Sequence, residues 1–382
     1  MRIVVALLGI GIVGASSTFG APLEDPARQV EALAAALGID LAPPALDGRV
    51  RPDPRAVEAL QSVRAALYDH LDRELQRTTP GSTPLPAGLA GYLEERREPL
   101  AALRQRLIAG EPPRWEGCNL LGQIQLQRLL LTQALARGSL AELEASWQLN
   151  AALREAPELI SQFVAIAVAR LQAGVLRRLD DVPAGWDERL LEHDYRESML
   201  HALEQESRSL RQVGAAGAAE LLEANRLQRT ALRWSEPYVS WCLADLDTRF
   251  RRHLVRLAEL DSLCPQEVRV LSERFVEELP WWNPLEALTT PLRGAIERVA
   301  RLEIDIELTH KLLLLVAERR RHGGLWPAAL AGLEDSTACT EFRWVYRVGA
   351  DGRTMQLALD RELDWPGVSG LILPTRWSSA TP

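Results

Sequence analysis

Hydrophobic and polar positions alternate with a period near 3.6 residues along most of the chain, which is the pattern of amphipathic α-helices. In one such stretch Leu60, Val63 and Leu67 recur at helical spacing. The pattern predicts helices at 54–77, 119–137, 140–156, 159–179, 186–211, 215–234, 237–260, 266–279 and 285–320, with a short helix inside 22–38. Gly138-Ser139 would join two of them as a hairpin. Pro291 is a candidate interruption of the longest.

The segment 159–179 is the least polar of these helices. Within its stretch LISQFVAIAV only Ser161 and Gln162 are polar, so we expect neighbouring helices to enclose it on most sides. Arg170 and Arg177 in the same segment argue against a membrane span.

Near the carboxyl end the period changes to two residues. Apolar side chains such as Trp344 and Tyr346 alternate with polar ones, and Leu357 continues the alternation after a turn at Asp351-Gly352. These features predict a β-hairpin. The predicted fold class is therefore mainly α, an irregular multi-helix bundle with a small C-terminal β-hairpin.

The first residues have the parts of a secretory signal. A short positive start is followed by an apolar run from Ile3 to Ala15, and then by small and polar residues through Ala21. This run is shorter than the roughly 20 apolar residues that a membrane span needs. We predict a signal peptide at 1–21, with an uncleaved N-terminal anchor as the alternative. Both predict export, either to the periplasm or in a membrane-anchored form facing the periplasm.

Linker composition indicates how the rest is organised. The stretch TTPGSTPLP at 78–86 is rich in proline and glycine and is a candidate subdomain boundary. After the signal or anchor at 1–21, the expected parts are an N-terminal helical segment at 22–110, a helical body at 111–322 and a C-terminal β-hairpin segment at 323–382.

Charge and motifs limit the chemistry. The formal net charge of −8 disfavours nucleic-acid binding driven by counterion release, so no nucleic-acid partner is predicted. Membrane contact is expected only through the N-terminal segment, if it is uncleaved. The chain lacks a Gly-x-Ser-x-Gly elbow, a Walker loop and the dinucleotide glycine fingerprint. No cofactor is predicted.

The four cysteines are Cys118, Cys242, Cys264 and Cys339, and they allow three pairings. None belongs to a Cys-x-x-Cys pair, which leaves zinc and thioredoxin-like readings without support. Cys242 and Cys264 lie near the ends of consecutive predicted helices, so this is the disulfide expected first. Four unpaired thiols are the alternative.

Three ligand-type residues share one face of the long helix at 285–320. Glu303, Glu307 and His310 include a Glu-x-x-His step, the spacing used in di-iron bundles. Such sites need a second step of this kind, and the chain has none. A polar stripe in which Glu307 pairs with Lys311 is therefore the first interpretation, and a metal site at Glu303, Glu307 and His310 is the alternative.

A second set of ligand-type residues falls on the predicted helix 186–211. His193, Glu197 and His201 are spaced four residues apart and lie on one side of that helix. Imidazoles beside a carboxylate can bind zinc or iron. The chain lacks a His-Glu-x-x-His motif and this stretch is densely charged, so a solvated polar face is the first interpretation and a metal site is the alternative.

Tryptophan is the most frequent aromatic residue, with 11 copies. Trp234, Trp241, Trp281 and Trp282 gather near predicted helix ends. Tryptophan joins a large apolar face to one hydrogen-bond donor, so these four are the predicted binding residues for a partner. Packing at helix junctions is the alternative.

The carboxyl end resembles a known family. HKLLLLVAERRRHGGLWPAALAGL followed by FRWVYRVGADGRTMQLAL is similar to the helix, Gly-x-x-Pro and β-hairpin order of type II secretion pseudopilins. The similarity covers about a seventh of the chain, 308–359, without a prepilin-peptidase motif or an acidic calcium loop. Together with EAPELISQFVAIAVARLQAGVL, this ending also resembles uncharacterised exported bacterial helical proteins, which implies a fold and a compartment.

These observations predict an exported helical protein that acts as a non-enzymatic binding or scaffold protein of the cell envelope, with an envelope protein as its partner. One alternative is a metal-assisted envelope hydrolase or oxidase that uses the ligand-type residues. The other, implied by the pseudopilin resemblance, is an accessory role beside a secretion apparatus.

Overall fold

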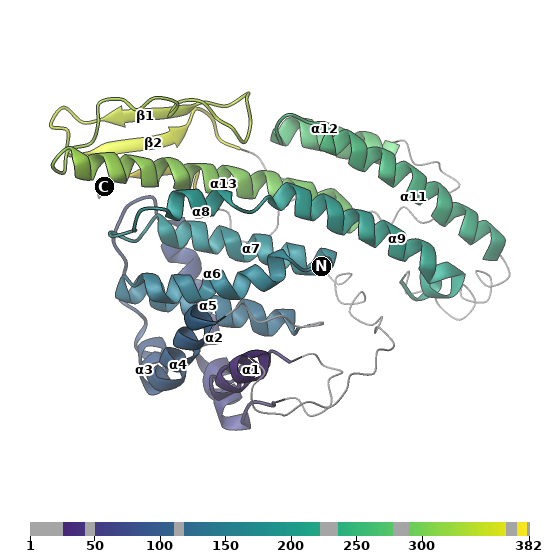
Figure 1. Cartoon of the computed structure of the whole chain (residues 1–382), viewed down its shortest axis with the longest axis horizontal. Coiled ribbons are helices and arrows are strands. Elements are labelled where there is room, and N and C mark those ends of the chain that lie inside the picture. The colour runs from purple at the N-terminus through teal and green to yellow at the C-terminus, as the bar shows by residue number, and fades with distance from the viewer. Residues whose placement is uncertain are drawn as a thin grey trace.

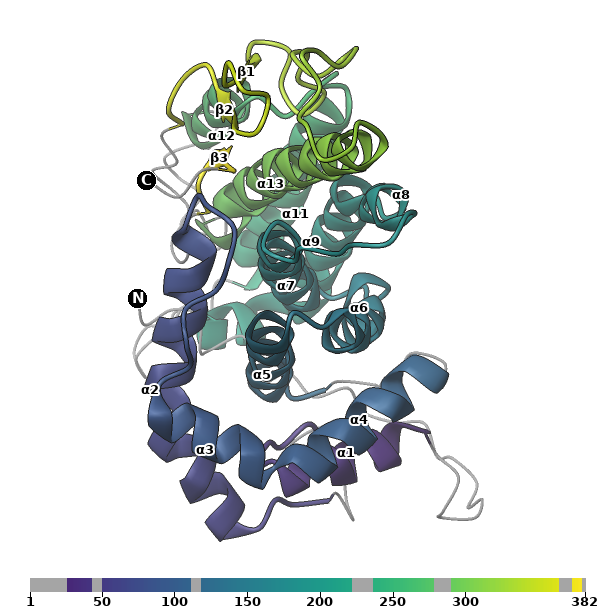
Figure 2. The same ribbon diagram turned by 90° about the vertical axis from the view of Figure 1, so that its left-hand side faces the viewer.

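The structure is a computed structural model, and it describes residues 26–42, 50–110, 118–221, 236–277, 290–363 and 373–379. The predicted signal or anchor at 1–21 lies outside these residues. Figures 1 and 2 label the helices α1 (Pro26–Ala36), α2 (Pro54–Gln76), α3 (Ala87–Glu95), α4 (Arg97–Ala109), α5 (Leu120–Arg137), α6 (Leu140–Arg154), α7 (Leu159–Leu176), α8 (Trp186–Leu191), α9 (Tyr195–Leu221), α11 (Glu236–Ala258), α12 (Pro265–Glu277) and α13 (Thr290–Arg321), and the strands β1 (Trp344–Val348) and β2 (Met355–Leu359). Figure 2 also labels the strand β3 (Arg376–Ser378).

The predicted fold class is confirmed: the chain is mainly α with a small C-terminal sheet. Figure 1 shows a stack with α1, α3 and α4 at the bottom, α5 to α7 in the middle, and α13 and the sheet at the top. Figure 2 shows α2 running along one side of this stack towards β3. There the backbone N–H of Ser378 donates to the carbonyl of Thr78 at 2.7 Å.

Two large hydrophobic clusters fill most of the stack, beside a third and much smaller one between α6 and α7. The smaller of the two large clusters joins the apolar faces of α1 to α4 with α5 and α6. The larger joins α5 to α9 with α11 to α13 and the sheet. Both clusters include residues of α5 and α6, so these two helices connect the lower and upper layers.

The hairpin of α5 and α6 forms as its turn residues predict. The side chain of Asn119 accepts a hydrogen bond from the N–H of Gly122 at the start of α5. Gly138 ends α5 with a φ of 61°, which favours glycine, and the Ser139 side chain caps α6 by accepting from the N–H of Ala141. Local capping chemistry therefore sets this hairpin.

Helix α7 is the core helix that the sequence predicts. It is long and apolar enough to cross a membrane by length and composition, and 83% of that window is buried inside the protein. Packing against α5, α6, α9 and α13 accounts for this burial. Helix α7 therefore connects the middle of the stack, where it contacts α5 and α6, with α13 at the top.

The prediction of a single helix at 186–211 is wrong. The structure ends α8 at Leu191 and begins α9 at Tyr195. The side chain of Asp194 accepts a hydrogen bond from the N–H of Glu197 at 2.8 Å, so it caps a new helix start. Helix α9 then continues to Leu221, past the break expected near residue 212.

The C-terminal hairpin is confirmed, and it belongs to a three-stranded antiparallel sheet. β1 pairs with β2 in the register Trp344↔Leu359, with a turn that contains Gly352 at a φ of 67°. β2 also pairs with β3, whose three residues are too few to show an alternating pattern. The sheet packs on the larger hydrophobic cluster through Trp344 and Leu357, which are buried.

Candidate functional site

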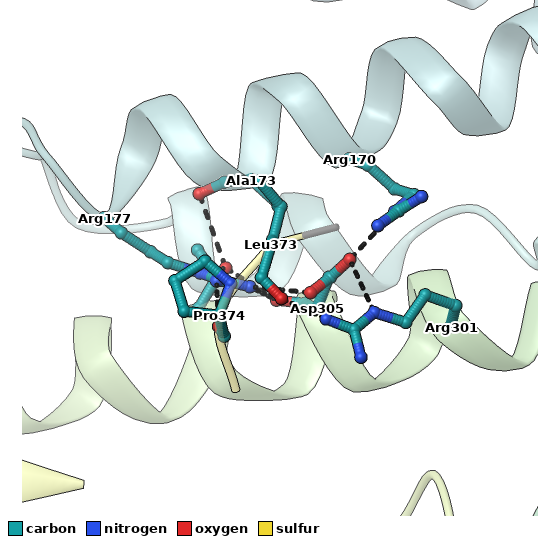
Figure 3. A network of polar contacts seen from close by, with 8 residues as sticks. Arg170, Ala173, Arg177, Arg301, Asp305, Leu373 and Pro374 are labelled. Atoms are coloured by element: carbon teal, nitrogen blue, oxygen red, sulfur yellow. Dashed lines mark hydrogen bonds and ion pairs between the residues drawn. The ribbon is translucent and has the colours of Figure 1, made fainter. Parts of the chain in front are cut away.

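A buried charged cluster joins α7 to α13, and we call it the Asp305 cluster. Arg170 lies on α7, Arg177 directly follows the last residue of that helix, and Arg301 lies one turn before Asp305 on α13. Arg170 Nε lies 2.9 Å from Asp305 Oδ2, and Arg177 Nη2 lies 3.4 Å from Oδ1. Arg301 Nε lies 3.7 Å from Oδ2. Figure 3 shows these three guanidinium groups converging on one carboxylate.

The Asp305 cluster also holds the end of the described chain. Arg177 Nη1 donates to the carbonyl of Pro374 at 3.2 Å, and Arg301 Nη2 donates to the carbonyl of Leu373. Figure 3 shows both residues beside the cluster. Because β3 follows directly, the cluster fixes the approach of the third strand to the helical stack.

Burial and charge act in opposite directions on this cluster. Burial lowers the pKa of Arg177 to about 10, and burial also lowers the pKa of Arg301. Burial alone would raise the pKa of Asp305, but Arg301, Arg170 and Arg177 together lower it below its usual value. All these groups are therefore charged near neutral pH, and the cluster acts as a structural ion network rather than a proton-transfer site.

The proposed metal ligand Glu307 is used by a loop. Its carboxylate accepts from the hydroxyl of Ser336 at 2.7 Å and from the N–H of Thr337 at 2.9 Å. Lys311 Nζ lies 3.5 Å from the same carboxylate and donates to the carbonyl of Asp335 at 2.8 Å. The predicted Glu307–Lys311 pair is confirmed, and both side chains anchor the segment before β1.

The predicted set of Glu303, Glu307 and His310 is not assembled as a metal site. Among the described residues, the one group of three possible ligands within reach of a single ion is Cys264, Cys339 and Glu341. Its two sulfurs are bonded to each other, so they are not metal ligands in this form. The shared helix face does not produce a metal site, because the carboxylate of Glu307 binds Ser336 and Thr337 in the segment before β1.

The second predicted set is separated by the break between α8 and α9. His193 lies in the break, while Glu197 and His201 are exposed on α9. His193 Nε2 lies 3.1 Å from the hydroxyl of Ser198. Burial lowers the pKa of His193 to about 4, helped by the nearby Arg154. The imidazole is therefore neutral near pH 7 and packs as part of a local turn.

The predicted disulfide between Cys242 and Cys264 is wrong. The structure pairs Cys264 with Cys339, and Cys242 is a buried cysteine outside this bond. Cys264 lies between α11 and α12, and Cys339 lies before β1, so the bond ties the α11–α12 connection to the sheet. Cys242 instead points into the packing between α11 and its neighbours. Proximity in sequence was a poor guide, because the segment held by Glu307 brings Cys339 to Cys264.

One of the four predicted tryptophans can be placed. Trp241 lies on α11 with 54% of its surface exposed, and its ring centroid is 6.1 Å from that of Tyr238. Trp234, Trp281 and Trp282 lie outside the described residues, so a cluster of all four stays a prediction. What the structure describes is an exposed aromatic pair, Tyr238 and Trp241, near the start of α11.

The Asp305 cluster was not predicted from the sequence. Arg170 and Arg177 counted only against a membrane span, although two arginines on an otherwise apolar helix need a buried partner once that helix is enclosed. The matching signal was Asp305 within the apolar stretch of α13, where Arg301 precedes it by four residues. That α7 and α13 lie side by side was not readable from either segment.

Glu303 supplies a pH-dependent prediction. Burial raises the pKa of its carboxyl from 4.5 to about 7, and the nearby Asp194 adds to the rise. The folded protein therefore disfavours the ionised form, and this cost grows as pH increases from 4.5 to about 7. We expect Glu303→Gln to raise the free energy of unfolding above pH 7, and this gain to vanish towards pH 4.5, as measured by urea denaturation.

Glu197→Gln is the matched control for this prediction, because Glu197 is exposed on α9. It should leave the free energy of unfolding nearly unchanged at every pH. A gain for Glu303→Gln that stays constant between pH 4.5 and 8 would contradict the prediction, since it would come from packing rather than from ionisation.

Comparison of the chain with protein-family models, curated proteins and solved structures found no match. The resemblance of 308–359 to pseudopilins therefore stays a prediction. What the chain does must be inferred from its own geometry.

Proposed function

We propose that the protein is an exported binding or scaffold protein of the cell envelope, and that it engages a partner protein through the exposed face of α11. The observation that carries this proposal is the aromatic pair Tyr238 and Trp241, which are 42% and 54% exposed. Tryptophan and tyrosine are the residues most enriched among those that dominate binding energy at protein interfaces.

The placement of α11 favours a docking role. Its inner face, which includes Val239, Leu246 and Phe250, is buried against neighbours that include α9 and α12. Trp241 lies on the outer face, and Val255 near the other end of the helix is also exposed. Figure 1 shows α9 and α11 reaching beyond the ends of α5 to α7. A partner could therefore approach α11 without meeting the main stack.

The disulfide supports the proposed compartment. Cys264 and Cys339 are both buried and bonded to each other. Disulfides persist in oxidising compartments such as the periplasm and are rare in the cytosol. This agrees with the secretory signal predicted at 1–21, which is an independent feature of the chain.

The metal-assisted alternative has less support. Its best ligand, Glu307, already accepts hydrogen bonds from Ser336 and Thr337 and pairs with Lys311. A metal ion would have to displace these contacts and release the segment before β1. The contacts of Glu307 therefore favour the binding function over the metal-assisted one.

Trp241→Ala is expected to weaken partner binding strongly. The tagged full chain would be isolated from its own host's envelope in mild detergent, and its partner identified and then titrated against purified protein. Removing a central interface tryptophan should weaken the affinity by about tenfold or more. The fold should survive, because the side chain is largely exposed.

Leu191→Ala is the matched control, because Leu191 is 57% exposed on α8, away from α11. The same amount of partner should co-purify with Leu191→Ala as with the unaltered chain. If Trp241→Ala bound the partner as tightly as the unaltered chain does, the exposed face of α11 would not be the binding surface. Recovery of the chain alone would count against the binding role and make metal content the next measurement.

A further inference from the structure

A groove lies where α13 ends and the chain turns back towards β1, and we call it the α13 groove. Glu318 and His322 form one side and residues 325–330 the other, around a volume of about 490 Å³. The turn passes through Gly323 and Gly324, whose φ values of 64° and 92° favour glycine. Its volume falls within the range of ordinary ligand sites, about 300–1,000 Å³.

The groove has a rigid apolar floor. Trp326 is buried, and its indole Nε1 donates to the carbonyl of Arg353 at 3.1 Å. Tyr346 of β1 donates its hydroxyl hydrogen to the carbonyl of Pro327 at 2.8 Å. Leu325 at the rim is 46% exposed. The sheet thus holds 325–330 in place and leaves apolar surface open to an incoming side chain.

Positive charge surrounds this floor. The guanidinium of Arg319 lies over the Trp326 ring at 4.7 Å from its centroid. The side chains of Arg321 and His322 are 73% and 57% exposed. Glu318 is the one carboxylate in the lining, and its two oxygens lie 2.5 Å from Arg321 Nη1 and 3.5 Å from His322 Nδ1. Arg319 and Arg321 together outweigh the single carboxylate of Glu318, so the rim of the groove carries a net positive charge in a chain of net charge −8.

We propose that the α13 groove binds an acidic peptide segment of a partner protein. One apolar side chain of that segment occupies the space between α13 and 325–330, and its flanking carboxylates face Arg319 and Arg321. The charge of the rim selects an acidic ligand, and the exposed apolar surface of Leu325, Ala328 and Ala329 selects an apolar anchor. This surface is separate from the α11 face, so the two proposals stand or fall independently.

The test uses fluorescein-labelled peptides and the full chain, with binding followed by fluorescence anisotropy. The probe is acetyl-Glu-Glu-Leu-Glu-Glu-amide, and its controls replace leucine by serine or every glutamate by lysine. The leucine peptide should bind about tenfold more tightly than either control, because it alone combines the apolar anchor with the acidic flanks. Raising the salt from about 50 to about 500 mM should weaken it several-fold.

A groove-filling variant assigns the binding to this site. Ala329→Trp puts a large side chain into the lining and should weaken the leucine peptide by about tenfold. Ala136→Trp, at an exposed position on α5 outside the groove, should bind as the unaltered chain does. Thermal unfolding of both variants confirms that they are folded. Equal affinity for the leucine and serine peptides, or unchanged affinity in a folded Ala329→Trp variant, would overturn the proposal.

Discussion

Asp305→Asn is expected to lower the free energy of unfolding by about 3–5 kcal/mol. The substitution keeps the size of the side chain but removes the carboxylate on which Arg170, Arg177 and Arg301 converge. Three buried guanidinium groups would then keep their positive charges without this counter-ion. Urea denaturation measures the loss, and we expect the transition to move to much lower urea.

Asp181→Asn is the matched control, because Asp181 forms an exposed ion pair with Arg320 and should matter little. A second test combines Asp305→Asn with Arg170→Met, which removes one of the unbalanced charges. The double variant should be more stable than Asp305→Asn alone. If Asp305→Asn and Asp181→Asn cost the same, the Asp305 cluster does not hold α7 and α13 together.

The pH dependence of this effect has a definite sign. The folded state lowers the pKa of Asp305 below its ordinary value of 3.8. Its contribution is therefore fully present above pH 3.8 and is lost as pH falls through the lower, folded-state pKa. The difference between the unaltered chain and Asp305→Asn should stay constant from pH 8 to about pH 5, the opposite of the change expected for Glu303→Gln over part of that range.

Removing the disulfide is the second change with a large expected effect. The double variant Cys264→Ala, Cys339→Ala should lower the free energy of unfolding by about 4 kcal/mol. The reason is the sequence separation of 75 residues, since opening so long a loop returns much conformational freedom to the unfolded chain. Urea denaturation under oxidising conditions measures the loss.

Cys242→Ala is the control for this pairing. It should keep the disulfide and leave one free thiol, that of Cys118, in a denaturing thiol assay. Cys339→Ala should leave three. Three free thiols in Cys242→Ala together with one in Cys339→Ala would show that Cys242 rather than Cys339 forms the disulfide, and three in both variants would show that no disulfide forms.

The disulfide, the Glu307 contacts and the Asp305 cluster act on the same region. Each one ties the C-terminal sheet or the segment before it to the helices, through Cys264, Glu307 or Arg177. An isolated two-stranded hairpin is marginally stable, and here the third strand and these contacts with the helices stabilise the sheet. The α13 groove rests on that support, because Trp326 and Pro327 are held by Arg353 and Tyr346.

Much of the fold was predictable because its signals are local. The helical period, the turn at Gly138-Ser139 and the alternation around Trp344 each lie within a few residues, and the structure confirms all three. The break at Asp194 was missed because its capping signal competes with a continuous helical pattern. β3 was missed because three residues carry no period.

The candidate sites depended on contacts that sequence patterns do not encode. The sequence by itself determined the mainly α class, most helix positions, the hairpin and the Glu307–Lys311 pair, since these follow from neighbours within a few turns. Only the tertiary structure decided that Arg170 meets Asp305, 135 residues away, and that Cys339 pairs with Cys264 rather than Cys242. Those partners are chosen by how α7, α13 and the sheet pack, because burying an arginine or positioning a thiol requires the whole core around it.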